Sequence, residues 1–252
     1  MSIVSEPTTP QHEPELRGQI VVVIGGSAGI GFETARRAGA EGAKLILAAR
    51  NPERLQRVAS ELGALAATPL DATDPASLDQ FFRDLPTSID HVIVTAGRPY
   101  YAPIFEMDFA EARRVLVDQM LMRLQVAKNA ARKIRPGGTL LLMGGTGGRR
   151  PRVGLSIVSA VTAALPALTA NLALELAPVR VNLIAAGFVD TPLSASLLGD
   201  ELENRRNELR ASLPIRRVVG PADVAALAVH IMVNTALTGA TYDVDGGQQL
   251  IP

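Results

Sequence analysis

The sequence predicts one α/β domain built on a doubly wound sheet of seven mainly parallel strands, with helices on both faces. Three observations predict it. Short β-branched runs alternate with helical stretches from residue 19 onward. A glycine-rich turn joins the first run to the first helix. The 252 residues, 47% of them hydrophobic, suffice for one substantial core, and neither a repeat nor a linker marks a second domain.

The elements follow one another in a regular order. The strands are expected at residues 19–24, 44–48, 67–71, 91–96, 139–143, 179–186 and 240–244. The principal helices are expected at residues 30–40, 52–62, 108–134 and 154–176. A charged, helix-prone insertion at 193–213 is interpreted as a substrate lid. The polar, proline-punctuated residues 1–17 predict a flexible arm before a dinucleotide-binding domain at 18–252.

Composition excludes several classes of function. The net charge is +0 and like charges form no block, so neither nucleic acid nor a membrane is expected as a partner. The absence of cysteine excludes disulfides, thiol catalysis and thiolate metal sites, and it fits a cytoplasmic protein. No metal site is expected. The uncharged stretch 153–174 contains Ser, Thr, Asn and Pro166, so it is interpreted as a buried helix and not as a membrane span.

The glycine turn follows the first strand and carries the spacing Gly-x-x-x-Gly-x-Gly. Glycines allow a tight turn and a close approach of backbone N–H groups to a ligand, and the helix that follows favours an anionic pyrophosphate at its N-terminus. The alternative is a glycine-rich turn that binds nothing. The residues expected to bind the cofactor here are Gly25, Ser27, Gly29, Ile30 and Gly31.

The end of the second strand predicts which dinucleotide is bound. About 20 residues after the glycines, dinucleotide sites contact the ribose, usually through an acid. This chain has Ala49 and then Arg50 there. Arginine attracts a 2′-phosphate, so NADP(H) is favoured over NAD(H) as cofactor. The alternative is a solvated arginine before the helix cap Asn51.

These motifs together resemble the short-chain dehydrogenase/reductase family, whose fold is Rossmann-type. The resemblance runs from about Leu16 to the C-terminus and includes "LDATD", "TAG", "AAGFVDTPL" and "YDVDGG" after successive strands. It implies hydride transfer between a nicotinamide and a small-molecule substrate, in a homodimer or homotetramer. It also implies further cofactor contacts from Asp71, Ala72, Ala96, Gly97, Gly187, Val189 and Thr191.

The same resemblance shows that the family's catalytic residues are replaced. The Ser, Tyr, Lys and Asn positions hold Gly145, Val158, Thr162 and Asp118, and no Tyr or Lys lies between residues 133 and 242. A positioned acid typically contributes about 10² to 10⁴ to a rate. Ordinary ketone reduction by the family mechanism should therefore be severely impaired.

Two residues are candidates for the missing chemistry. Tyr101, after "TAG", offers a phenol beside the expected substrate, although it would equally serve as a packing residue. Asp118 would favour a cationic substrate such as an iminium, which accepts hydride without an acid; the alternative is a paired or protonated carboxyl inside the helix layer. Arg149, Arg150 and Arg152 would steer an anionic substrate or remain solvated.

Two functions follow from this pattern. The first is an NADP(H)-dependent oxidoreductase with an altered proton donor, which reduces an imine, an iminium or another activated C=N or C=O acceptor. The second is a catalytically inactive NADP(H)-binding protein that acts as a sensor or structural partner. Helices 108–134 and 154–176 are apolar around much of their circumference, which predicts faces buried against a second subunit.

Overall fold

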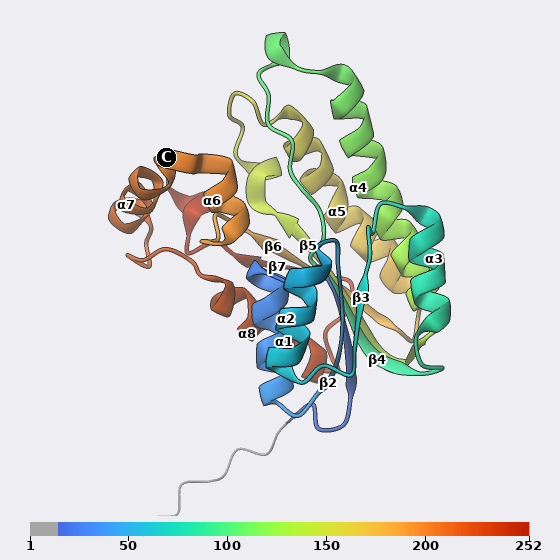
Figure 1. Cartoon of the computed structure of the whole chain (residues 1–252). Helices are drawn as coiled ribbons and strands as arrows, with labels where there is room; N and C mark the ends of the chain where they lie inside the picture. Colours follow the sequence, from blue (N-terminus) through green and yellow to red (C-terminus); the bar gives the residue numbers. More distant parts are fainter. Residues whose placement is uncertain (1–14, 252) are drawn as a thin grey trace, which may run out of the picture.

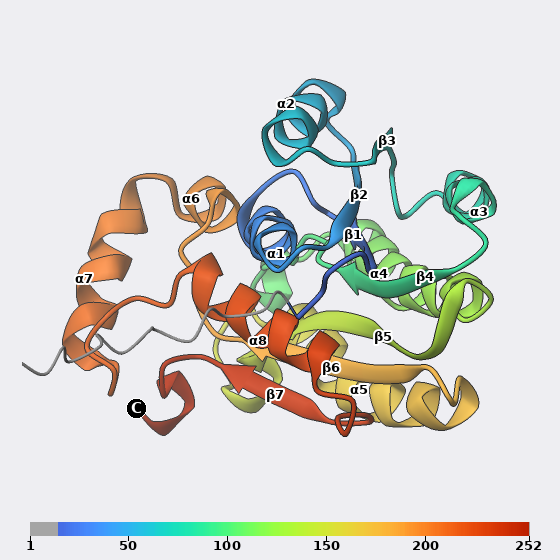
Figure 2. The same cartoon turned by 90° about the horizontal axis from the view of Figure 1, so that it is seen from below.

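The computed structural model describes residues 15–251, and its centre is a seven-stranded sheet (Figures 1 and 2). The strand order is β3-β2-β1-β4-β5-β6-β7, and every neighbouring pair is parallel. The strands are β1 (Ile20–Ile24), β2 (Lys44–Ala49), β3 (Ala66–Pro69), β4 (Ile89–Val94), β5 (Ile134–Gly145), β6 (Arg180–Ala186) and β7 (Thr241–Val244). The predicted fold class is confirmed.

Eight α-helices of the described chain cover the sheet and its carboxyl edge. They are α1 (Gly29–Ala40), α2 (Pro52–Leu62), α3 (Pro75–Asp84), α4 (Phe109–Ala130), α5 (Ser156–Glu175), α6 (Pro192–Leu198), α7 (Leu202–Ser212) and α8 (Pro221–Val233). The chain crosses over from the β1–β2–β3 half to β4 on the other side of β1. Ligands of such sheets bind beyond the carboxyl ends of the strands at this crossover.

Side chains of the central strands alternate between two cores. Val22 and Ile24 of β1 join one core with residues of α3, α4 and α5, whereas Val21 and Val23 join the other with residues of α1, α2 and α8. Because both faces of β1 are buried, its sequence is a continuous apolar run with no polar alternation. Figure 2 shows the two helix layers on opposite sides of the sheet.

The structure changes two expectations about element boundaries. Residues 1–14 of the predicted arm lie outside the described residues, but Leu16 is fully buried and its N–H donates to the carbonyl of Glu41 at 3.0 Å. The end of the predicted arm therefore belongs to the folded domain. The helix expected at 108–134 ends at Ala130, because Ile134 already pairs with Ile89 of β4.

Helix α5 is less buried than its composition predicted. Its buried residues are Val161, Leu165, Thr169 and Leu172, and Leu174 on its outer side is largely exposed. The prediction that this helix is buried is therefore wrong for its outer face, which is exposed in the single chain. Among the described helices, α5 is also the one with the length and hydropathy to cross a membrane.

One buried histidine gives stability a defined pH dependence. His91 lies at the start of β4, where its Nε2 is 2.8 Å from Oε1 of Gln19 while its buried Nδ1 has no partner in the described structure. Burial lowers the His91 pKa from 6.5 to about 4, although the charge of Asp90 opposes the shift. Protonation at Nδ1 would create a buried cation with an unsatisfied N–H group.

We expect this histidine to destabilise the fold in acid. Between pH 6.5 and about 4 the unfolded chain binds the proton more strongly than the folded chain. The His91 contribution is therefore fully present above pH 6.5 and falls by about 3 kcal/mol as the pH drops to 4. Urea unfolding of the wild type and His91→Gln across this range measures the difference. Parallel pH curves for the two proteins would contradict the prediction.

Candidate active site

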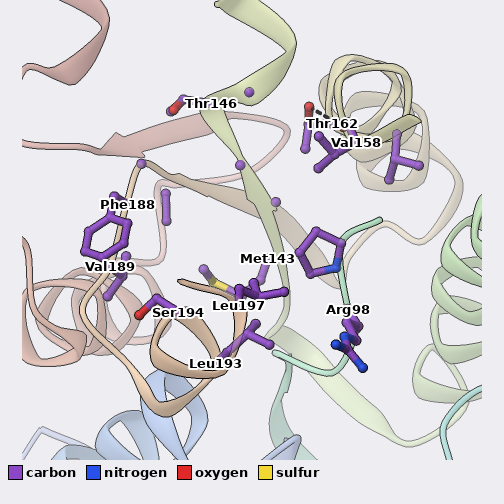
Figure 3. A pocket seen from close by; sticks show the side chains of 18 of the residues that line it. Arg98, Met143, Thr146, Val158, Thr162, Phe188, Val189, Leu193, Ser194 and Leu197 are labelled. Atoms are coloured by element: carbon purple, nitrogen blue, oxygen red, sulfur yellow. Dashed lines mark hydrogen bonds between the residues drawn. The ribbon is translucent and has the colours of Figure 1, made fainter. Parts of the chain in front are cut away.

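A cavity of about 800 Å³ opens beyond the carboxyl ends of the central strands. Its walls come from the ends of β4, β5 and β6, from α4 and α5, and from α6 on the opposite side. Figure 3 shows Val158 and Thr162 projecting from α5, Leu193 and Leu197 from α6, and Met143 between them. The cavity also includes residues of the predicted lid: Leu193, Ser194, Leu197, Leu198 and Arg205. The lid function remains a prediction, which this lining supports.

Two glycines of the turn after β1, Gly25 and Gly31, leave no room for a side chain. A Cβ on Gly31 would lie 2.2 Å from the carbonyl oxygen of Gly25, and a Cβ on Gly25 would lie 2.4 Å from Oγ1 of Thr95. The Thr95 hydroxyl donates to the carbonyl of Ile24 or Gly25, both at 3.2 Å, and so ties the turn to the end of β4. Threonine at this position therefore supports the turn geometry.

The N-terminus of α1 is open to an anion. Its N-cap, Ala28, has no side-chain hydrogen bond, and the first turn carries no acidic residue. Gly29 has φ +54, a conformation that glycine adopts without strain. Free N–H groups and the positive end of a helix are the features that bind a pyrophosphate. The turn therefore fits the dinucleotide predicted for it.

The loop after β6 closes the other side of the cofactor region. Gln248 accepts a hydrogen bond from the N–H of Phe188 at 2.8 Å, and a Cβ on Gly187 would lie 2.5 Å from the same Oε1 atom. Thr191 begins α6 with a capping box that includes Ser194. The side chain of Thr191 would also contact a Cβ on Gly29, at 3.4 Å. The predicted contacts after β1 and β6 therefore meet in space.

The predicted adenosine contacts lie on the β2–β3 side, outside the cavity lining. Arg50 is exposed at the end of β2, and its charge acts on the nearby carboxylate of Asp71. Hydrogen bonds from the N–H and the hydroxyl of Thr73, together with Arg50, lower the Asp71 pKa. Ala72 beside it is buried. Ile30, Ala96, Gly97, Gly187, Val189 and Thr191 line the cavity.

The positions aligned with the family's serine, tyrosine and lysine face the cavity together. A Cβ on Gly145 would lie 3.5 Å from Cγ2 of Thr162. The Thr162 hydroxyl donates to the carbonyl of Val158 at 2.8 Å, and Ser159 donates to the carbonyl of Gly147 at 3.0 Å. Among the described residues that line the cavity there is no lysine, histidine or carboxylate. The site therefore contains no ordinary general base.

The two candidate catalytic residues have different surroundings. Tyr101 lines the cavity and is half exposed, but burial raises the pKa of its phenol, which makes it a weaker acid. The hydroxyl of neighbouring Tyr100 instead accepts the N–H of Asp108 at 2.9 Å, at the start of α4. Tyr101 stays a candidate for contact with substrate.

Asp118 does not face the substrate region as predicted. It is absent from the described lining, while Val115, Gln119 and Arg123 of the same helix are present. Their spacing of four residues defines the face of α4 toward the cavity, and Asp118 lies about 100° away from it. The charge of Asp118 instead helps to raise the pKa of Arg114, one helical turn away. This placement gives no support to the hypothesis that Asp118 selects a cationic substrate, which stays a prediction.

The charges that do line the cavity are all positive, within the part of the chain that the structure describes. They are Arg98, Arg123, Arg150, Arg152 and Arg205. Arg150 donates to the carbonyl of Gln248 at 2.6 Å, and Arg205 pairs with Glu208. Arg149 points elsewhere and forms a bidentate pair with Asp243. Such a field favours neutral or anionic ligands.

Gln119 and Arg123 are the site residues that the sequence analysis missed. They interrupt the apolar run "QMLMRLQVA" at positions i and i+4, which places both on one helix face. A charged residue among apolar neighbours is the signal that would have indicated Arg123. Gln119 also donates from Nε2 to the carbonyl of Arg98 at 3.3 Å, beside Gly97.

The fold and the glycine turn are those of an α/β dinucleotide-binding protein, with a cavity beyond the strand ends. A family model described as "Enoyl-(Acyl carrier protein) reductase" matches residues 25–249. The chain belongs to the short-chain dehydrogenase/reductase family, as the motifs predicted.

Individual relatives agree with this assignment. The short-chain dehydrogenase/reductase malC from Malbranchea aurantiaca is 27% identical over 253 residues, covering 93% of this chain and 96% of the relative. Its structure, described as a reductase/Diels-Alderase, covers 94% of this chain and 99% of its own, with a TM-score of 0.86.

Two structural relatives were solved with NADPH. One is a small-chain dehydrogenase that is 29% identical, covers 92% of this chain and 99% of its own, and gives a TM-score of 0.81. The other is BdcA, which is 26% identical, covers 92% of this chain and 95% of its own, and gives a TM-score of 0.82. The predicted class of cofactor, a nicotinamide dinucleotide, is confirmed for the family.

Proposed function

We propose that this chain is an NADP(H)-dependent oxidoreductase that reduces an activated C=O or C=N acceptor in a small molecule. The observation that carries the proposal is the open cavity beside the sterically required glycine turn. A cavity of about 800 Å³ has room for a substrate next to a nicotinamide. A bound NADPH supplies the hydride, while the chain orients the acceptor and stabilises charge.

The lining restricts the acceptor. Without a lysine, a histidine or a carboxylate among the described lining residues, the site favours a substrate that is already polarised. Its arginines favour neutral or anionic acceptors over an iminium cation. A neutral imine or an activated carbonyl compound satisfies both conditions. We further propose that the protein is cytoplasmic and forms a homo-oligomer. Exposed Val117, Leu121 and Leu174 on α4 and α5 support the assembly.

The test is NADPH oxidation by the purified protein with matched pairs of acceptors. Each pair combines a neutral cyclic imine or a ketone bearing an electron-withdrawing group with its unactivated ketone, and NADH serves as cofactor control. We expect turnover of the activated member only. Turnover of unactivated ketones at rates ordinary for the family would contradict the proposal that the site requires an activated acceptor. NADPH binding without turnover of any acceptor would favour the rival function, a catalytically inactive cofactor-binding protein.

Arg50 predicts the cofactor preference. Replacing it by Ala removes the cation proposed to bind the 2′-phosphate, so we expect NADPH affinity to fall by about 10- to 100-fold while NADH affinity changes little. Calorimetric titration of both cofactors measures the effect. Arg54→Ala, another exposed arginine one helical turn further on, is the matched control. An equal loss for NADPH and NADH would assign Arg50 a structural role.

A further inference from the structure

Arg123 is a buried arginine beneath the cavity. It belongs to α4, has 5% of its surface exposed and lines the cavity together with Gln119. Nη1 donates to the backbone carbonyl and to Oε1 of Gln119, both at 2.6 Å. Nη2 donates to the carbonyl of Met143 on β5 at 3.1 Å. Three neutral oxygens therefore fix the guanidinium between the helix and the sheet.

The hydrogen-bonding capacity of Arg123 is only partly used. A guanidinium has five N–H donors, and three hydrogen bonds are formed with residues in the described structure. Nε is buried and has no acceptor among the described residues. The two unused N–H groups belong to Nε and Nη2, which are neighbouring nitrogens of the planar group. Paired N–H donors of a guanidinium can bind both oxygens of a carboxylate.

The charge of Arg123 also has no counter-ion. It takes part in no ion pair with a described residue, and no aspartate or glutamate lies among the described residues of the cavity lining. Burial lowers its pKa to about 10, so the group still carries its charge at neutral pH. An unpaired buried charge destabilises the site, and an anion that enters the cavity offsets this effect.

Arg123 lies near the positions at which the family's catalytic residues are replaced. Met143, its acceptor on β5, lies two residues before Gly145, and Gly145 faces Thr162. Thr162 stands at the position aligned with the family's lysine and is neutral. Arg123 is the one buried cation of the described lining, since Arg98 and Arg152 are exposed and Arg150 and Arg205 have partners.

We propose that Arg123 is an anion-binding group that holds a carboxylate of the substrate at the floor of the cavity. This inference rests on the proposed function and adds to it the substrate class: acceptors that carry a carboxylate. Gln119 orients the guanidinium through Oε1 and is a positioning residue.

The test measures binding of matched charged and neutral probes, with and without NADP⁺. Benzoate and 3-phenylpropanoate are compared with benzamide and 3-phenylpropanamide by ligand-observed NMR titration. We expect the wild type to bind each carboxylate about tenfold or more tightly than its amide. Arg123→Met should remove this preference without changing amide affinity, and Arg123→Lys should keep part of it. Arg152→Met, on the exposed part of the lining, should change carboxylate affinity by less than about threefold.

Three results would overturn the proposal. The first is equal binding of carboxylates and amides by the wild type, or binding of neither. The second is full carboxylate preference in Arg123→Met. The third is loss of the preference in Arg152→Met alone. Circular dichroism reports the folding of each variant. If Arg123→Met does not fold, the carboxylate and amide affinities of the wild type and of Arg123→Lys still test the proposal. NADPH affinity is measured in a separate titration. Absence of NADPH binding would contradict the proposed function and would leave the carboxylate test of Arg123 unaffected.

Discussion

Replacing Arg180 by Met will lower the free energy of unfolding by about 4 kcal/mol or more, because a buried cation that satisfies many carbonyls is lost. Arg180 begins β6 and is 6% exposed. Its guanidinium donates to the carbonyl oxygens of Gly137, Ile231, Met232, Asn234 and Leu237, at 2.7 to 3.1 Å. Most of these belong to the last turn of α8 and the residues after it, where a helix leaves carbonyls unpaired and attracts positive charge.

The measurement is equilibrium urea unfolding of the variant and the wild type. Arg217→Met is the matched control, because Arg217 pairs with Asp223 at the other end of α8 but is exposed. Exposed pairs contribute at most about 1 kcal/mol, so we expect the control to lose that much or less. Arg180→Lys keeps the charge without the planar group and should fall between the two. Equal losses in Arg180→Met and Arg217→Met would contradict the structural role.

Replacing Gly31 by Ala will abolish measurable NADPH binding, a loss of about a thousandfold or more. The added Cβ would lie 2.2 Å from a backbone oxygen of Gly25 and 2.6 Å from Oγ1 of Thr95. The Gly25 carbonyl is backbone and cannot move by a side-chain rotation, so the turn that is expected to hold the pyrophosphate must move. Helix propensity alone would make the same change favourable by about 1 kcal/mol.

Gly39→Ala provides the control in the same helix. Its Cβ would meet the end of the Leu45 side chain at 3.3 Å, which can move, so we expect unchanged NADPH affinity and equal or greater stability. Thermal unfolding of both variants separates loss of binding from loss of folding. Retention of NADPH affinity within about threefold in folded Gly31→Ala would show that this turn does not bind the cofactor.

The sequence predicted the sheet because its signals are local. β-Branched runs, the glycine turn and the Asn51 cap each depend on a few neighbouring residues. The boundary at Ile134 was missed because it depends on pairing with Ile89, 45 residues earlier in the chain. Such contacts leave no local pattern.

The candidate site was predicted less completely, for a physical reason. The spacing of glycines before a helix can be recognised in the sequence. The direction of a helical side chain depends instead on which face of the helix packs on the sheet. Alignment placed Asp118 at a family position, but rotation of α4 puts Gln119 and Arg123 toward the cavity. The apolar residues around Arg123 gave a signal that required the helix to be oriented first.

Helices α6 and α7 bury few of their residues, and an ion pair ties α7 to the loop after β6. Leu209 is the one residue of these two helices that is buried, and Arg206 of α7 pairs with Asp190 in that loop. A segment with so little apolar burial opens locally at a small free-energy cost, and salt weakens the pair that closes it. Amide hydrogens of α7 should therefore exchange with solvent faster than those of β5, and faster still at high ionic strength. If the segment acts as the predicted lid, we expect higher ionic strength to open the cavity more often, while the sheet stays intact.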